Sequence, residues 1–521
     1  MSEFEALVGL LLAAVILAAV ARRVGAPYPA FLALGGAVLA FVPGAPTFSV
    51  QPELALALFV APVLLDAAYD ASPRDLKDNW APVTGLVVVS VALTTIAVAG
   101  VTRALVPAMP WAAATALGAI VAPPDAAAAT AVLRQLRPPH RILTILEGES
   151  LLNDASALLI YRLAVGAVAA NAFSLRAVAP AFLLAVAGSV VAGPALAWLY
   201  LRMTKNVQDV PTSIILQFIG TFGVWILADR IGLSGVLTMV CYAVAIARRA
   251  PELTPARIRI PSYAVWDTVI FVLNVLAFVF IGLQIRPILT SLDPIVRTRY
   301  LYVAGAVLLT VIVVRIVWVM TFNAFVRWRD RRYGFHPRRP MLRPSVPSGL
   351  IISWCGMRGI VSLAAALALP INLDGRPFPF RDLIVLTAFF VVLGTLVIQG
   401  LTLRPLLEAL DLHDNDPVGH EVEAARRRAL EAALASSDGD ASPTAEAVRQ
   451  ELMAHLSHAT PDTTDSEAGR SAHEEIHQRA LAAARHVIFE MRSTDDIGDD
   501  AFHQLEEELD WIEMGTGARD E

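Results

Sequence analysis

The densest group of polar residues in an otherwise apolar part of the chain lies in LEGESLLNDASALLIYR, residues 146–162. Ser150 and Asp154 are four residues apart, as are Glu149 and Asn153, so each pair shares one face of a helix. Glu149 and Asp154 are five apart and point about 140° away from each other. One face therefore offers two oxygen ligands for a cation, and the other offers a carboxylate and an amide that need partners.

Asp154 is the residue of this group that predicts ion transport. It lies about 12 residues beyond Ile142, or about 18 Å along a helix, which is near the middle of a hydrocarbon core of about 30 Å. A charge at that depth costs at least about 2.5–3.5 kcal/mol and usually marks a pathway or an ion pair. A buried carboxylate binds a proton readily and a bound cation displaces that proton, so the two ligands would compete at Asp154.

Two arginines are candidates to neutralise a second buried carboxylate, Glu149. Arg315 is embedded in LLTVIVVRIVWVM and Arg358 in ISWCGMRGIVSL, both well inside apolar stretches. Because an unpaired carboxylate is costly at this depth, we expect at least one arginine to pair with it. The residues leave the choice open, and either arginine could instead snorkel to an interface.

The composition of the chain predicts an all-α membrane protein. Over 521 residues it is 56% hydrophobic and 17% charged, with a mean hydropathy of +0.59, well above an ordinary soluble domain. No Gly-rich phosphate loop, HExxH or GxSxG motif is present, so we do not expect an enzyme. Apolar stretches long enough to span a bilayer recur about thirteen times, near 4–20, 27–43, 53–68, 82–102, 112–132, 142–168, 177–201, 211–228, 231–247, 263–285, 300–322, 347–370 and 382–409.

Basic residues mark every second loop between these stretches, as expected of cytoplasmic loops. Arg297 and Arg299 are the main exception. The pattern, with an odd number of spans, predicts a multi-pass protein of a bacterial inner membrane with its N-terminus outside and its C-terminal tail in the cytoplasm. The basic residues of the predicted cytoplasmic loops are Arg22 and Arg23; Arg74 and Lys77; Arg134, Arg137 and Arg141; Arg202 and Lys205; Arg248, Arg249, Arg257 and Arg259; and the cluster from Arg327 to Arg343.

Two spans contain a break. The fifth includes Pro123 and Pro124, which cannot both sit in a regular helix without loss of hydrogen bonds, and the twelfth contains Gly356-Met357-Arg358-Gly359. A simple proline kink is the alternative for the fifth span, because a full break at membrane depth is tolerated only where the freed backbone is buried or lines a site. Spans five and twelve are seven apart and so run in opposite directions. This predicts inverted repeats, about 4–168 and 211–409, whose interrupted helices cross near the midplane.

Asp66 is a further intramembrane carboxylate, near the end of FVAPVLLDAAY in the third span. A proline precedes it by four residues. It could cap that helix near the cytoplasmic side, or it could contribute to an ion path, and the sequence favours neither.

Residues 411–521 differ in character from residues 1–410, the predicted transmembrane domain. They hold 9 Lys and Arg against 27 Asp and Glu, whereas residues 1–410 hold 32 against 20. Helical periodicity near 420–436, 443–457, 468–492 and 498–513 predicts a small acidic helical tail in the cytoplasm. His473 and His477 lie one turn apart in it, and a solvated helix face is favoured over a metal or pH-sensing role. The chain's two cysteines, Cys241 and Cys355, lie in apolar stretches and predict neither a disulfide nor a thiolate metal site.

At these residues the sequence resembles the monovalent cation:proton antiporter family, which contains bacterial Na⁺/H⁺ antiporters and the animal sodium/proton exchangers. The resemblance covers roughly residues 4–410. Its most specific element is Gly-Glu-Ser-x-x-Asn-Asp. It rests on five segments in the family's order and spacing, which are FVAPVLLDAAY, APPDAAAATAVL, EGESLLNDASALLIYR, FVFIGLQIRP and WCGMRGIVSLAAALALP.

The resemblance implies roles for the residues of span six. Asp154 would carry Na⁺ and H⁺ in turn, with Ser150 as a second ligand of Na⁺ and Asn153 as the amide partner. Glu149 would pair with Arg315, which matches the family's arginine in the eleventh span.

The resemblance also implies roles at the two breaks. Arg358 matches the arginine beside the interrupted twelfth helix, and Asp125 belongs to the ion site. Many members have Thr-Asp-Pro at the break in span five, where this chain has Pro124-Asp125-Ala126, so the carbonyl of Pro123 or Pro124 would replace the missing hydroxyl. Asp66 occupies a position where relatives often carry glutamate.

The function expected from these residues is secondary antiport of Na⁺ for H⁺, with Li⁺ or K⁺ as other candidate cations. Asn153 in place of a second aspartate resembles the electroneutral branch and implies one cation per proton. The alternatives are a proton-coupled symporter of a small solute and a membrane sensor with the tail as its output. No cofactor and no nucleic-acid partner is expected, and the resemblance implies a homodimer.

Overall fold

The computed structural model of the chain describes residues 2–24, 27–42, 54, 56–125, 128–130, 133, 138–170, 175–290, 292–334, 343–373, 376–412 and 417–436, with seven isolated positions between 449 and 509. The chain divides into two compact units, Met1–Asn415 and Asp416–Glu521. In the second unit, α20 (Pro417–Ser436) covers the first helix predicted for the tail. The other tail helices predicted near 443–457, 468–492 and 498–513, with His473 and His477, lie outside the described residues apart from those isolated positions.

The first unit is a bundle of helices in which six predicted spans precede α11 (Leu175–Thr204) and six follow it. Ahead of α11, the described part of the chain forms α1 (Ser2–Val24), α2 (Tyr28–Leu39), the π-helical η1 (Leu56–Val60) continued by α4 (Ala61–Asp70), the short α5 (Pro73–Asp78), the run α6 (Trp80–Thr84), η2 (Gly85–Ser90) and α7 (Val91–Leu105), then α8 (Trp111–Val121) and α10 (His140–Ala170).

After α11 the chain forms α12 (Val210–Arg230), α13 (Gly235–Leu253), α14 (Ala256–Leu283), α15 (Ile285–Thr290), α16 (Pro294–Tyr333), α17 (Val346–Trp354), α18 (Ile360–Leu367) and α19 (Arg381–Leu410). A two-residue antiparallel pair, β1 (Asn372–Leu373) and β2 (Arg376–Pro377), separates α18 from α19. The sequence did not predict this small hairpin.

Side-chain caps begin several of the helices, and backbone hydrogen bonding explains why the long apolar segments are helical. The side chains of Asp209, Ser234 and Ser345 accept a hydrogen bond from the backbone N–H three residues ahead, and so cap α12, α13 and α17. Within a bilayer no water satisfies the backbone, so a spanning segment must bond its own N–H and C=O groups. Long apolar runs therefore fold as helices.

Seven helices of the described chain are long and apolar enough to cross a membrane, and four shorter apolar helices accompany them. The other predicted spans correspond to α13 and to the pair α17 and α18. The predicted all-α membrane fold of about thirteen spans is thus confirmed.

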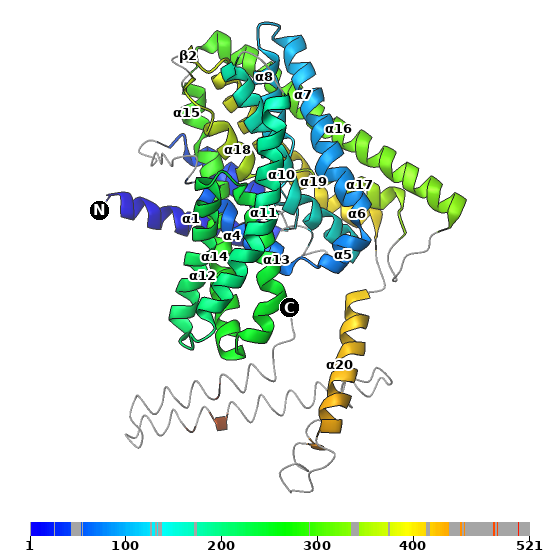
Figure 1. The fold of residues 1–521 in the computed structure, drawn as a ribbon. Helices are drawn as coiled ribbons and strands as arrows, with labels where there is room; N and C mark the ends of the chain where they lie inside the picture. Colours follow the sequence, from blue (N-terminus) through cyan, green and yellow to red (C-terminus); the bar gives the residue numbers. More distant parts are fainter. Residues whose placement is uncertain are drawn as a thin grey trace. The chain divides into compact units, whose positions relative to one another are not determined.

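The bundle separates apolar side chains that face outward from those that fill its core. Leu184 on α11 and Leu309 on α16 are largely exposed, as expected of a surface that faces lipid. Many side chains of α19, including those of Leu386, Phe389 and Val392, are fully buried and belong to the core. Helix α8 packs against both α10 and α18, and Figure 1 shows α8 descending from the upper part of this unit toward them.

Candidate functional site

Two interrupted helices meet in the first unit, and both interruptions fall where the sequence predicts them. Helix α8 ends at Val121 and residues 122–125 are not helical, so the double proline is a break and not a kink. The second break, residues 355–359, separates α17 from α18. The two breaks are bonded directly, because the backbone N–H of Asp125 donates to the carbonyl of Met357 at 2.7 Å.

Arg358 satisfies the carbonyls that the first break leaves without helical donors. Prolines supply no N–H, and the N–H of Asp125 is used by Met357, so the last carbonyls of α8 need other partners. The guanidinium of Arg358 donates to Val121 at 3.0 Å and to Ala122 at 3.2 Å. It also bonds the Gly356 carbonyl, and its side chain is only 1% exposed. Arg358 therefore lies in the protein interior and does not snorkel.

Arg315 does the same for the second break and also pairs with Glu149. Its guanidinium donates to the two carboxylate oxygens of Glu149 at 2.6 and 2.9 Å. It further donates to three carbonyls at the end of α17, those of Ile352 at 3.0 Å, Ser353 at 3.2 Å and Cys355 at 3.2 Å. Of the two arginines that the sequence leaves open, Arg315 is the partner of Glu149.

Each interrupted helix thus has a buried arginine at its C-terminal end, Arg358 for α8 and Arg315 for α17. A helix C-terminus carries a partial negative charge, which a cation stabilises. Both arginines come from elements of the second half of the unit, and both act across long separations in sequence. At both breaks, carbonyls that lack helical donors thereby gain hydrogen-bond partners.

Gly359 makes room for Asp125 at the crossing. A Cβ at position 359 would overlap the carboxylate of Asp125. Gly359 is also the residue that precedes α18, so the Asp125 carboxylate lies against the N-terminal end of that helix. A negative charge is favourable at a helix N-terminus.

Asn153 ties α10 to the first break. Its side-chain amide donates to the carbonyl of Pro124 at 2.9 Å, and the residue is fully buried. Its Oδ1 has no hydrogen-bond partner among the described residues. Asn153 therefore holds the first break against α10, one residue before Asp154.

A small cavity lies at Asp154. Its volume is about 40 Å³, and its lining includes Ser150, Asp154, Pro123, Pro124 and Asp125. A cavity needs roughly 10–15 Å³ to hold one water molecule, so this one has room for only a few. Asp154 itself is 8% exposed. Five of the residues predicted to bind the ion thus line one cavity.

Two polar residues of this cavity were missed by the sequence reasoning, Asn274 on α14 and Ser362 on α18. Asn274 interrupts the apolar run FVLNVLAFVF, and this polar residue in an apolar span was the available signal. Ser362 lies four residues beyond Arg358, one turn into the helix that follows the break. Each has a side-chain oxygen that is a possible ligand for a cation.

Asp66 lies elsewhere. Residues Val63 and Leu64 of α4 line the Asp154 cavity, but Leu65 and Asp66 line a second cavity of about 150 Å³ between α4, α11, α12, α13 and α14. Asp66 is not brought to the Asp154 cavity.

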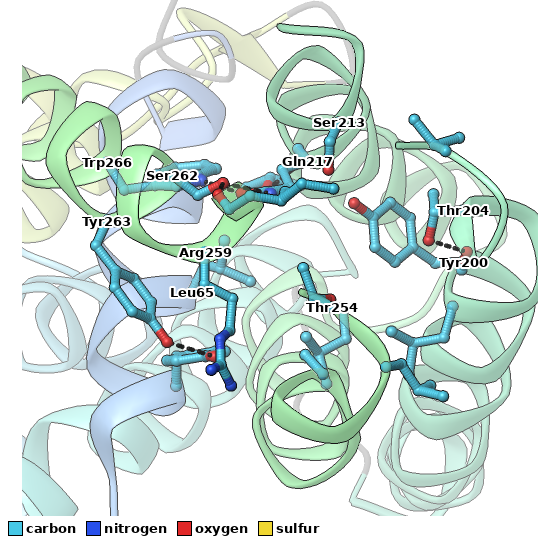
Figure 2. A pocket seen from close by; sticks show the side chains of 18 of the residues that line it. Leu65, Tyr200, Thr204, Ser213, Gln217, Thr254, Arg259, Ser262, Tyr263 and Trp266 are labelled. Carbon is cyan, nitrogen blue, oxygen red and sulfur yellow. Dashed lines mark hydrogen bonds between the residues drawn. The ribbon is translucent and has the colours of Figure 1, made fainter. Parts of the chain in front are cut away.

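Figure 2 shows the polar wall of this second cavity. Trp266 donates from Nε1 to Gln217 at 2.7 Å, and Gln217 donates to Ser262 at 3.1 Å. The hydroxyl groups of Tyr263 and Tyr69 lie 3.4 Å apart. This wall carries neutral hydrogen-bonding groups, while Asp66, Lys205 and Arg259 add charged side chains to the lining of the cavity.

Among the described residues no group of three or more His, Cys, Asp and Glu side chains is placed to hold a metal ion. The lining of the Asp154 cavity includes the carboxylate residues Asp125 and Asp154 and neutral residues that carry oxygen atoms. Such neutral and acidic oxygens suit hard cations.

The fold is a helical membrane bundle in which two broken helices cross beside a buried aspartate. A cavity of about 40 Å³ lies at that aspartate. Together these features define a membrane-embedded ion carrier. Residues 10–409 match the family model described as "Sodium/hydrogen exchanger, transmembrane". The chain belongs to this family of transporters.

Individual relatives agree with the family assignment. The chain is 28% identical over 505 residues to the sodium, potassium, lithium and rubidium/H⁺ antiporter of Bacillus subtilis, covering 94% of this chain and 74% of the relative. It is 31% identical over 461 residues to an uncharacterised Na⁺/H⁺ exchanger of Mycobacterium tuberculosis, covering 86% of this chain and 82% of the relative. The sodium proton antiporter MjNhaP1 of Methanocaldococcus jannaschii shares the fold, with a TM-score of 0.61 and 18% identity over 79% of this chain and 99% of that one.

Proposed function

We propose that the protein exchanges Na⁺ for H⁺ across the membrane, one cation for one proton, by alternating access to Asp154. The observation that carries the proposal is the cavity of about 40 Å³ that joins Asp154, Ser150 and Asp125 to the broken backbone at Pro123 and Pro124. It has room for a small cation with little of its water. Cavities that take organic ligands are about 300–1,000 Å³, so the size disfavours a symporter of an organic solute.

The ligand set at the cavity supports competition between the two substrates. Asp154 and Ser150 lie on one face of α10, one turn apart, and the Pro123 carbonyl and the Asp125 carboxylate belong to the break opposite them. Na⁺ would bind the ionised carboxylate of Asp154 together with these oxygens. A proton on Asp154 would remove the charge that attracts Na⁺. Either ligand can bind, and the two exclude each other.

Asn153 supports a stoichiometry of one cation to one proton. It precedes Asp154 in the chain, carries no titratable proton at working pH, and is engaged with the Pro124 carbonyl. The second carboxylate of the cavity, Asp125, lies against the N-terminal end of α18, where its negative charge is stabilised. Asp154 is then the one group that changes its proton in each cycle.

The paired breaks support the proposal of alternating access. Interrupted helices that cross at the midplane are the usual frame for a site that opens to each side in turn. The arginines that cap α8 and α17 keep both breaks satisfied while the surrounding helices move. We propose Asp66, in the neighbouring cavity, as a carboxylate on the approach to the site and not as a direct ligand.

The proposed setting is a bacterial inner membrane, with the N-terminus outside and residues 411–521 as an acidic cytoplasmic tail. The excess of Arg and Lys in every second loop of residues 1–410 supports this orientation. We further propose that two copies associate as a homodimer, as the family resemblance implies. Na⁺ is the proposed cation, with Li⁺ and K⁺ to be compared directly, since the Bacillus subtilis relative is described with all three.

The test uses the purified protein in liposomes that hold an internal acid load and a pH-sensitive dye. External NaCl, LiCl, KCl and choline chloride are added in turn, and the release of protons is measured with and without an imposed membrane potential. We expect Na⁺ to dissipate the gradient, choline to have no effect, and the rate to be independent of the potential. A gradient that no alkali cation dissipates would refute exchange, and a rate that follows the potential would refute the one-to-one stoichiometry.

A further inference from the structure

We propose that a separate cavity, at the end of the bundle where the basic loops lie, binds the headgroup of an anionic phospholipid whose headgroup bears hydroxyl groups. The cavity has a volume of about 330 Å³ and shares no lining residue with the Asp154 cavity. This volume falls in the range of small-molecule sites, about 300–1,000 Å³. Its walls are the starts of α6, α10 and α17 and the last turns of α16.

Three arginines from three segments line this cavity, Arg141 on α10, Arg329 on α16 and Arg343 before α17. One carboxylate, Asp78, lines it as well, and Asp330 lies 3.6 Å from Arg329. With both acids counted, the group retains one net positive charge. A phosphodiester carries one negative charge, so its binding would neutralise the group, and guanidinium groups hold phosphate through paired hydrogen bonds.

A buried amide at the base of the cavity points to a ligand that also donates hydrogen bonds. Asn323 lines the cavity and is 9% exposed. Its Nδ2 donates to the Ser345 carbonyl at 2.7 Å, but its Oδ1 has no partner within the described parts of the chain. A phosphodiester has no donor to offer, whereas a headgroup hydroxyl has one. This favours a phospholipid whose headgroup bears hydroxyl groups, such as glycerol, over one whose headgroup bears none.

Gly349 on α17 accounts for the depth of this amide. A Cβ at position 349 would overlap the side-chain nitrogen of Asn323. The absence of a side chain therefore lets α16 place Asn323 against the first turn of α17, next to Ser348.

The aromatic residues around the cavity place it at the depth of lipid headgroups. Trp80 and Phe325 line it and are 66% and 55% exposed. Trp318 and Phe322 pack together on the same wall, with ring centroids 5.8 Å apart. Tryptophan is enriched at membrane interfaces, and basic pockets between helices on the cytoplasmic side suit anionic headgroups. The apolar wall would contact the glycerol and acyl portion that a soluble anion lacks.

A lipid in this position would join elements that carry the transport machinery. Helix α10 holds Asp154, α16 holds Arg315, and α17 leads into the second break. The bound lipid would hold the ends of these three helices together, which gives a stabilising role separate from ion exchange.

The experiment measures the thermal unfolding temperature of the full chain in a neutral detergent with phosphatidylglycerol, phosphatidylcholine or inorganic phosphate. Phosphatidylglycerol should raise the unfolding temperature, with a shift that grows with the logarithm of its concentration. Phosphatidylcholine, a zwitterion with the same phosphodiester, and inorganic phosphate should not. A shift of equal size with inorganic phosphate would overturn the lipid assignment in favour of a soluble anion.

Variants then locate the site. Arg329→Gln and Arg343→Gln should each weaken phosphatidylglycerol binding about fivefold, and the double variant about 25-fold. Arg299→Gln is the matched control, because it removes the same charge near the opposite end of α16. Native mass spectrometry of each purified variant counts retained lipid independently of its stability. Equal lipid retention and equal thermal shifts in all four proteins would refute the site.

Discussion

The guanidinium of Arg315 binds both carboxylate oxygens of Glu149, at 2.6 and 2.9 Å, and the two side chains are 1% and 2% exposed. The same guanidinium donates to three carbonyls at the end of α17. Arg315 therefore neutralises a buried carboxylate on α10 and caps the C-terminal end of α17. The pair connects the helix that carries Asp154 to the second break.

The stability lost on removing each partner of this pair should not be additive, because loss of one partner leaves a buried charge behind. Glu149→Gln leaves a buried arginine and Arg315→Gln leaves a buried carboxylate, and each change should destabilise the protein by about 3–5 kcal/mol. The double variant should lose less than the sum of the two, although it still lacks the bonds from Arg315 to α17. Thermal unfolding of the three variants in detergent decides the matter, and strictly additive losses would count against the pairing.

Gly359→Ala should impair exchange, because the added methyl group would overlap the Asp125 carboxylate and force the two breaks apart. The matched control is Gly305→Ala on α16, where an added Cβ meets nothing within 4 Å. That control should be neutral or slightly stabilising, since alanine favours a helix by up to about 1 kcal/mol over glycine. Initial rates of Na⁺-driven proton release in liposomes provide the comparison. Unimpaired exchange by the alanine variant at position 359 would show that the crossing tolerates displacement of Asp125.

Removal of the acidic tail should alter regulation and leave exchange intact. A chain that ends after residue 412 keeps all the spanning helices and the residues of the Asp154 cavity. We expect it to exchange Na⁺ for H⁺ with a changed dependence of rate on pH, since the tail holds 27 acidic and 9 basic residues. The measurement is the exchange rate across a pH series for both chains. A truncated chain that is well folded but inactive would contradict a purely regulatory tail.

The sequence predicts the spanning helices and the two breaks because each depends on local properties. Apolar length sets the spans, and Pro123 and Pro124 cannot both join a regular helix. The depth of Asp154 follows from counting residues along one helix. Each of these inferences requires no knowledge of which helices are neighbours.

Long-range packing accounts for what the sequence did not predict. Arg358 bonds Val121, 237 residues away, and that contact depends on the crossing of the two breaks. Asp66 lines the second cavity, whereas Leu64 lines the first. Which residues of α4 line each cavity depends on how this helix is rotated about its axis, and packing against neighbouring helices sets that rotation. Asn274 and Ser362 join the Asp154 cavity for the same reason. The sequence shows that both residues are polar, but it does not show that they line the same cavity.

We propose that Asp154 carries both substrates. Asp154→Asn keeps the size of the side chain but removes the charge that binds Na⁺ and the oxygen that takes up H⁺, so exchange should fall to the level of empty liposomes. Asp154→Glu keeps the charge but displaces the oxygens by about one methylene, which should weaken Na⁺ binding more than it reduces the maximal rate. Asp125→Asn should lose less than Asp154→Asn, because Asp125 mainly faces the end of α18.

The most direct measurement is Na⁺-driven dissipation of a proton gradient in liposomes that contain Asp154→Asn, with the folding of the variant verified by its unfolding temperature. Asp229→Asn is the matched control, since its carboxylate is 60% exposed and lies outside the cavity. The predicted result is no exchange by Asp154→Asn and normal exchange by Asp229→Asn. Exchange by folded Asp154→Asn at a rate comparable with the unmodified protein would contradict the account and move the carrier to Asp125 or Asp66.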